Sequence, residues 1–180
     1  MTDCINIVPV KFSNQTILNR IIDELQHCFV QPVNIIDLPL DIEKSYHPER
    51  SQYYSTQILA DALNLTGLPQ GKILILTEAD LFIPVLTFVF GEAQLKGTHS
   101  IVSACRLHEE FYSGISNDEL LIQRIMKELL HELGHNFGLK HCENWDCVMH
   151  SSPGIEEVDI KGKGYCHKCA VIAEGYKNVL

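Results

Sequence analysis

The stretch around which this sequence is organised is HELGHNFGLKH, residues 131–141. Residues four apart on an α-helix share one face, so the imidazoles of His131 and His135 can both reach one metal ion. Glu132 is offset by one position, which places its carboxylate beside such an ion, where it can take a proton from metal-bound water. The motif therefore predicts a helix that carries two metal ligands and a general base.

His141 needs a change of backbone direction before it can join the same ion. In a continuing helix it would lie on roughly the opposite face from His135, about 9 Å further along the axis. Gly138 removes this difficulty, because glycine adopts the left-handed conformation that ends a helix and lets the chain turn back. Three histidines leave one coordination position open, which is typical of a catalytic zinc. We therefore predict one catalytic zinc held by His131, His135 and His141.

The helix that carries the motif is expected to begin well before it. Ser116-Asn-Asp-Glu119 fits a capping box, the pattern of a helix start. A broad apolar face follows, and we expect this helix to be long, largely buried and to end near Gly138. The face consists of Leu120, Leu121, Ile122, Ile125, Met126, Leu129, Leu130 and Leu133.

Apolar segments further upstream predict an α/β fold. Helices are expected at residues 17–29 and 58–65, because apolar side chains recur there at helical spacing. Two strand–helix units imply parallel pairing, and the last two expected strands are close enough in the chain to form a hairpin. The expected sheet is twisted and mostly parallel, with one antiparallel edge strand. Its strands are expected at residues 4–10, 33–38, 72–77, 85–90 and 98–107.

The composition changes after Gly138, where few large apolar side chains remain. A segment this small needs a staple, and clustered cysteines in a reducing compartment favour a bound metal. We predict a single domain over residues 1–180, divided into an upper subdomain (1–138) and a C-terminal subdomain (139–180). The expected ligands of a structural zinc in the second part are Cys142, Cys147, Cys166 and Cys169.

Other interpretations of these cysteines remain open at this point. Cys166-x-x-Cys169 is also the spacing of a redox pair, and the four thiols could form two disulfides. A histidine next to a cysteine, His150 or His167, could also replace one thiolate as a ligand.

Composition and charge limit the partners of this chain. The 180 residues carry 14 basic and 23 acidic side chains, a net charge of -9. This charge disfavours nucleic acid and anionic membrane surfaces as partners. No apolar run reaches the roughly 20 residues that a membrane helix needs. The first residues lack an export signal, so we expect a cytoplasmic protein, and we expect it to be a monomer.

The pattern around the histidines resembles a known family. His-Glu-x-x-His-x-x-Gly-x-x-His is the elongated metzincin motif, and Met149 matches the Met-turn methionine that lies beneath the metal in that clan. Cys142 directly after the third histidine, then Cys147 and the pair Cys166-x-x-Cys169, look like the extended signature of the archaemetzincins. The resemblance covers residues 131–169 and extends more weakly to residues 48–53.

This resemblance implies a metzincin-like α/β fold with a long active-site helix and a small C-terminal subdomain stapled by zinc. It implies a zinc metallopeptidase with two Zn²⁺ per chain, one catalytic and one structural. Peptide bonds would be hydrolysed by zinc-bound water, with Glu132 as the general base, in an aminopeptidase or an endopeptidase. The alternative is a two-zinc binding module, or an amidohydrolase of narrow specificity with no general peptidase activity.

Three features of the cleft stay open. Some metzincins carry a tyrosine two residues after the methionine, but Ser151 stands there, so no oxyanion-stabilising residue is assigned. The segment Phe88–Glu92 either supplies a sheet edge for the substrate backbone or forms an ordinary core strand. The polar residues 41–50 either cover the cleft or serve as a simple connector.

Overall fold

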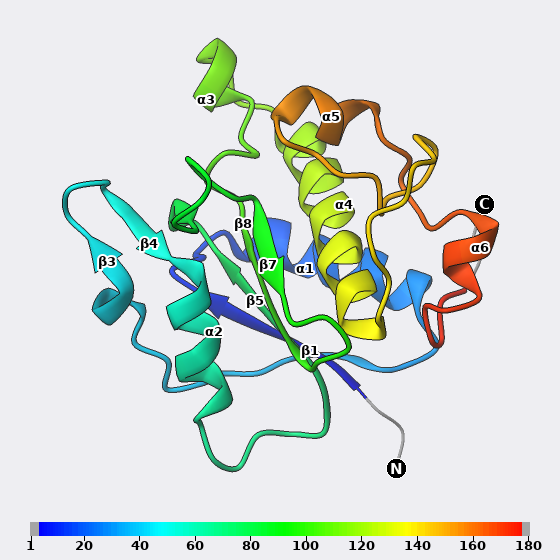
Figure 1. The fold of residues 1–180 in the computed structure, drawn as a ribbon, viewed down its shortest axis with the longest axis horizontal. Helices are drawn as coiled ribbons and strands as arrows, with labels where there is room; N and C mark the ends of the chain where they lie inside the picture. Colours follow the sequence, from blue (N-terminus) through cyan, green and yellow to red (C-terminus); the bar gives the residue numbers. More distant parts are fainter. Residues whose placement is uncertain (1–3, 178–180) are drawn as a thin grey trace.

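Five strands form the central sheet of the structure, a computed structural model that describes residues 4–177. The strand order is β2-β1-β5-β8-β7. The first four strands pair in parallel, and β7 runs antiparallel to β8 at one edge (Figure 1). The predicted mostly parallel sheet with one antiparallel edge strand is confirmed. The strands are β1 (Cys4–Val10), β2 (Val33–Ile35), β5 (Gly71–Thr77), β7 (Gly91–Ala93) and β8 (His99–Ser103).

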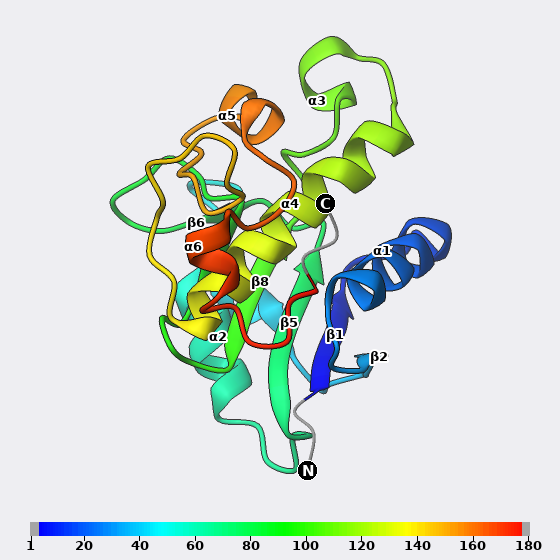
Figure 2. The ribbon, with the colours of Figure 1, turned by 90° about the vertical axis from the view of Figure 1, so that its right-hand side faces the viewer.

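Helices cover both faces of this sheet (Figure 2). Alternate side chains of β5 point to opposite faces, as the pleat of a strand requires. Leu74 and Leu76 pack with α1 and α4 in the larger core, whereas Ile73 and Ile75 pack with α2 in the smaller one. A strand buried on both faces has a continuous apolar sequence, which is why β5 was recognisable. The helices are α1 (Gln15–Cys28), α2 (Ser55–Leu63) and α4 (Asp118–Phe137).

Helix α4 is the predicted long helix, but it begins one residue later than the expected capping box. Its N-cap is Asn117, whose side chain accepts a hydrogen bond from the N–H of Leu120 at 3.1 Å. Ser116 is therefore not the cap, and Glu119 pairs with Arg20 of α1 instead. Asparagine is as good an N-cap as serine, so the pattern placed the start correctly to within one residue. The helix ends at Gly138, which has φ 98°.

A second, three-stranded sheet of order β3-β4-β6 was not predicted. Strands this short carry too few residues for a periodic pattern. The 3-10 helix η1 and β3 occupy most of the polar segment 41–50. The elements are η1 (Ile42–Ser45), β3 (Tyr46–His47), β4 (Gln52–Tyr54) and β6 (Leu81–Phe82).

The strand predicted at residues 85–90 is wrong. Most of that segment is irregular, Val85 is 83% exposed, and the edge strand begins only at Gly91. The guanidinium of Arg50 donates hydrogen bonds to the carbonyls of Leu86 and Thr87, at 3.0 and 2.9 Å. Because a side chain satisfies these carbonyls, no neighbouring strand is needed there. The strands at 33–38 and 98–107 exist but are shorter than predicted.

The chain after Gly138 packs against α4. Its buried side chains join the apolar core that α4 shares with the sheet. It contains two short helices, α5 (Ile155–Ile160) and α6 (His167–Ala170); a third short helix, α3 (Glu110–Ser113), precedes α4. The buried Met149, Val158 and Tyr165 belong to the same apolar cluster as the α4 side chains.

Within residues 4–177, no helix combines the length and the apolar character that a membrane crossing requires.

Arg124 links α4 to α5, and its removal should destabilise the fold. Its guanidinium, 4% exposed, donates to Asp159 at 2.7 Å and to Glu109 at 2.9 Å. Arg124→Met leaves two partly exposed carboxylates unpaired, so we expect a loss of about 2–3 kcal/mol in the free energy of unfolding. Urea denaturation measures this loss. Arg20→Met, in the exposed pair with Glu119, is the control, and an equal loss there would contradict the assignment.

Candidate active site and metal centres

Helix α4 presents His131 and His135 side by side. Nδ1 of His131 lies 2.8 Å from the carbonyl oxygen of Val148, and Nδ1 of His135 lies 2.8 Å from that of Leu139. A carbonyl oxygen only accepts hydrogen bonds, so each Nδ1 carries the ring proton and each Nε2 keeps a lone pair.

The lone pairs on the two Nε2 atoms are placed to bind one metal ion. The two Nε2 atoms of His131 and His135 are 3.1 Å apart. With no proton on either atom, they repel one another unless a cation lies between them. Two nitrogens bound to zinc at about 2.0–2.1 Å in a tetrahedral arrangement are roughly 3.3 Å apart, close to this separation.

His141 joins them from the loop that follows the helix. Its ring centroid lies 5.3 Å from that of His131 and 5.1 Å from that of His135. One ring nitrogen from each of the three lies within 4.8 Å of the others. Burial lowers the pKa of all three imidazoles, to well below its ordinary value for His131. Neutral imidazoles are the form that binds metal.

Glu132 lies beside the three histidines, between α4 and the edge strand β7. Burial raises the pKa of its carboxyl well above the ordinary value; Glu128 adds to this rise and Lys161 opposes it. Room for the carboxyl comes from Gly91, since a Cβ at that position would lie 2.6 Å from Oε1 of Glu132. Glycine at position 91 thus lets the strand approach the helix.

Met149 packs directly under α4. It is fully buried, and a Cβ on Gly134 would overlap its sulfur atom. The carbonyl of Met149 also accepts a hydrogen bond from the N–H of Cys142 at 2.9 Å. Sequence reasoning missed Gly134, although a glycine inside a helix is a signal of close packing.

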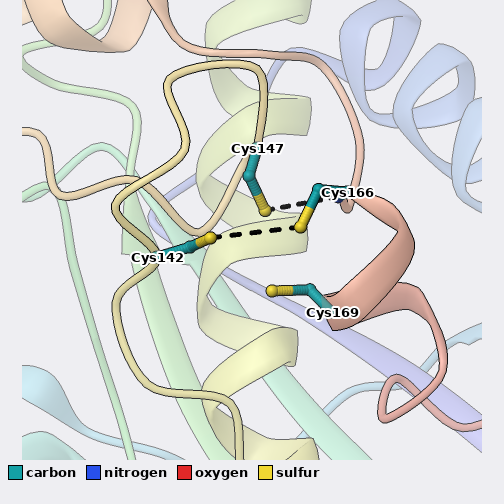
Figure 3. A group of neighbouring side chains, drawn as sticks. All are labelled: Cys142, Cys147, Cys166 and Cys169. Carbon is teal, nitrogen blue, oxygen red and sulfur yellow. Dashed lines mark hydrogen bonds between the residues drawn. The ribbon is translucent and has the colours of Figure 1, made fainter.

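The four cysteines of the C-terminal segment converge on one point (Figure 3). Their Sγ atoms all lie within 4.8 Å of one another, and those of Cys142 and Cys166 are 4.0 Å apart. Thiolates bound to zinc at about 2.3 Å in a tetrahedral arrangement are roughly 3.8 Å apart, so the donor set fits one zinc ion. The group also contains Cys147 and Cys169.

Two of the alternatives for these cysteines, the disulfides and a histidine ligand, find no support in the described part of the chain. All seven cysteines are free, so no disulfide forms among residues 4–177. The group formed by the four cysteines contains no histidine. His150 stacks instead on Trp145, with ring centroids 3.8 Å apart, and its Nδ1 lies 3.0 Å from the carbonyl oxygen of Cys142.

A cleft of about 850 Å³ lies over the histidines. One wall is the segment 86–93, which includes Phe88–Glu92 and the start of β7; the other includes Ser151–Pro153. No residue of the polar segment 41–50 lines this cleft, so the structure favours the connector over the cover. Sequence reasoning missed Glu128, which lines the cleft one helical turn before Glu132.

Comparisons with known proteins find relatives in one peptidase family. A model of peptidase family M54 matches residues 12–174. The archaemetzincin of Thermococcus kodakarensis is 45% identical over 127 residues, which cover 69% of this chain and 68% of that protein. The archaemetzincin of Pyrococcus furiosus is 35% identical over 176 residues, which cover 94% of this chain and 91% of that protein.

Solved structures give the same result. The crystal structure of a zinc-dependent peptidase from Methanocorpusculum labreanum has a TM-score of 0.83 and 32% identity, covering 94% of this chain and 100% of that one. An archaemetzincin from Archaeoglobus fulgidus, complexed with malonate, has a TM-score of 0.79 and 34% identity, covering 93% of this chain and 98% of that one. Fold and relatives together define a zinc metallopeptidase. The chain belongs to peptidase family M54, and its resemblance to the archaemetzincins is confirmed.

Proposed function

We propose that this chain hydrolyses peptide bonds in the cleft over His131, His135 and His141, with one zinc ion at these histidines and a second at the four cysteines. The proposal rests on one observation above all. Two unprotonated Nε2 atoms lie 3.1 Å apart, next to a buried carboxyl group and beneath an open cleft. Zinc at the histidines would act as a Lewis acid on the scissile carbonyl and on the attacking water.

The protein's own groups supply the proton transfer and the orientation. Glu132 accepts a proton from the attacking water and passes it to the leaving amine. The carbonyls of Val148 and Leu139 hold the imidazoles in the tautomer that leaves Nε2 free. Strand β7 is hydrogen-bonded to β8 on one side only, so its other side can pair with an extended peptide.

Two further points belong to this proposal. Four unpaired thiols in one cluster fit a reducing compartment such as the cytoplasm. A buried carboxyl group at position 132 favours hydrolysis over a pure binding module, since a module that only binds has no use for a base there.

The test is cleavage of a mixed peptide library by zinc-quantified protein, followed by mass spectrometry. Cleavage that stops when the zinc is chelated supports the proposal. Loss of single N-terminal residues would identify an aminopeptidase, and internal cuts an endopeptidase. Intact peptides after incubation with fully zinc-loaded protein would overturn general peptidase action and leave the amidohydrolase of narrow specificity or the two-zinc binding module.

Gly91→Ala should slow this cleavage without loss of zinc. The new methyl group would lie 2.6 Å from Oε1 of Glu132 and 2.8 Å from the carbonyl oxygen of Ile101, so the carboxyl of Glu132 must move, while none of the three zinc-binding residues is changed. We expect kcat to fall about tenfold or more, because a displacement of about 1 Å is costly in an active site. Glu132→Asp, which withdraws the carboxyl by one methylene, should make the same Gly91 change less harmful. A fall that is equal in both backgrounds would contradict the contact.

A further inference from the structure

One residue that lines the cleft, Glu128, belongs to a buried ion pair that the proposed hydrolysis does not use. Oε1 of Glu128 lies 2.7 Å from Nζ of Lys161, the residue that follows α5. The side chains are 4% and 0% exposed. Apart from this ion pair, neither atom has a hydrogen-bond partner in the part of the chain that the structure describes.

Stability alone does not explain this pair. Removing two charges from water offsets most of their attraction, so apolar side chains of similar size would serve a core equally well. Glu128 is also not an ordinary core residue, because it lines the cleft. A carboxylate has about four lone-pair sites, and Lys161 occupies one of them. Lys161 thus fixes a carboxylate that can still accept hydrogen bonds.

A second polar group on the cleft lacks a partner. The buried hydroxyl oxygen of Ser152 has no hydrogen bond within residues 4–177, and Ser152 lines the cleft. An aliphatic side chain placed here would leave the hydroxyl of Ser152 and the remaining lone pairs of Glu128 without partners, which is unfavourable. A side chain with N–H donors would satisfy the carboxylate.

The charges along the cleft also determine which charge a bound side chain can carry. Glu92, Glu128 and Glu132 line it, and Lys140 is the one cation among the lining residues. Lys161 lies buried behind Glu128. A further carboxylate would be repelled by this surface, whereas a cation or a neutral amide would not.

We propose that Glu128, positioned by Lys161, selects substrates with a basic or amide side chain beside the scissile bond. Glu128 lies one turn of α4, about 5.4 Å, from Glu132, so the side chain it contacts belongs to a residue next to the attacked carbonyl. Lysine, arginine, asparagine and glutamine are accepted, and aliphatic or acidic residues are disfavoured. This inference rests on the proposed peptidase function.

The experiment compares side-chain preference in the peptide library between wild type and the double variant Glu128→Leu/Lys161→Met, both with zinc quantified. Wild type should cleave peptides with a basic or amide residue at one position about tenfold or more faster than their leucine counterparts. The double variant should lose or invert that ratio. The matched control, Glu119→Leu/Arg20→Met, makes the same chemical changes in an exposed pair and should keep it.

A second variant covers the case in which the double variant does not fold. Glu128→Gln keeps the shape of the side chain but removes its charge, so the preference for lysine and arginine should fall about tenfold while that for amides persists. Wild-type preference in every folded variant would overturn the proposal and leave the peptidase function intact.

If wild type cleaves no peptide, the proposed function fails, and binding then tests the subsite. Zinc-loaded Glu132→Gln protein, immobilised, should retain library peptides enriched in basic and amide residues. The same enrichment after adding Glu128→Leu/Lys161→Met, or no enrichment at all, would overturn the inference.

Discussion

Glu132→Gln is expected to lower kcat/KM for peptide cleavage by about 10²- to 10⁴-fold without changing the zinc content of the protein. The amide has the shape of the carboxyl group but cannot accept the proton of the attacking water. Zinc content should not change, because the metal-binding group at this site consists of His131, His135 and His141. Initial rates on a peptide found in the library, together with elemental analysis for zinc, measure both quantities.

The control for this variant is a second carboxylate of the same cleft. Glu92 is held by the hydroxyls of Ser55 and Thr56 at 2.5 and 2.8 Å, at the start of α2. Glu92→Gln should therefore lower the rate far less than Glu132→Gln. Comparable losses would assign the effect to the charge of the cleft and contradict a specific proton transfer at Glu132.

Cys169→Ser should cost the protein both its C-terminal packing and the zinc ion proposed at the four cysteines. Binding of a structural zinc contributes about 10–16 kcal/mol in small domains, and most of that contribution is folding free energy. Cys169 is buried in the same cluster as Met149 and Tyr165, so its loss exposes the underside of α4. We expect zinc to fall below one ion per chain, along with a large drop in the thermal unfolding temperature.

The histidine site should weaken in this variant too, because it depends on the same segment. Val148 supplies the carbonyl that orients His131, and His141 is bonded directly to Cys142. Cys105→Ser, at a half-buried thiol outside the cluster, is the control and should keep the zinc content of the wild type. A Cys169→Ser protein that retains one zinc and unchanged histidine geometry would show that the two sites are independent.

The metal-binding residues were predictable because their geometry is local. Helical spacing places His131 beside His135, and one glycine explains how the chain returns to His141. The residues that position the catalytic groups were not predictable, because they lie far from those groups in the sequence. Gly91 makes room for Glu132 from a strand, and no pattern in the sequence connects the two.

The wrong strand at residues 85–90 has a functional cause. Its apolar residues were assigned to the core of a sheet, but the structure places Leu86 and Phe88 on the cleft. A binding surface and a core both need apolar side chains, so composition does not separate them. The ion pair of Glu128 with Lys161 was missed for a related reason, since either residue alone is typical of a solvated surface.

The stack between Trp145 and His150 places a fluorophore beside the four-cysteine group. Trp145 is the single tryptophan of the chain, and it lies between Cys142 and Cys147. Indole fluorescence depends on what touches the ring, and here that partner is an imidazole hydrogen-bonded to the backbone of Cys142. Emission excited selectively at the indole is therefore a local signal from the cysteine loop, and we expect removal of a zinc ion from the four cysteines to change it.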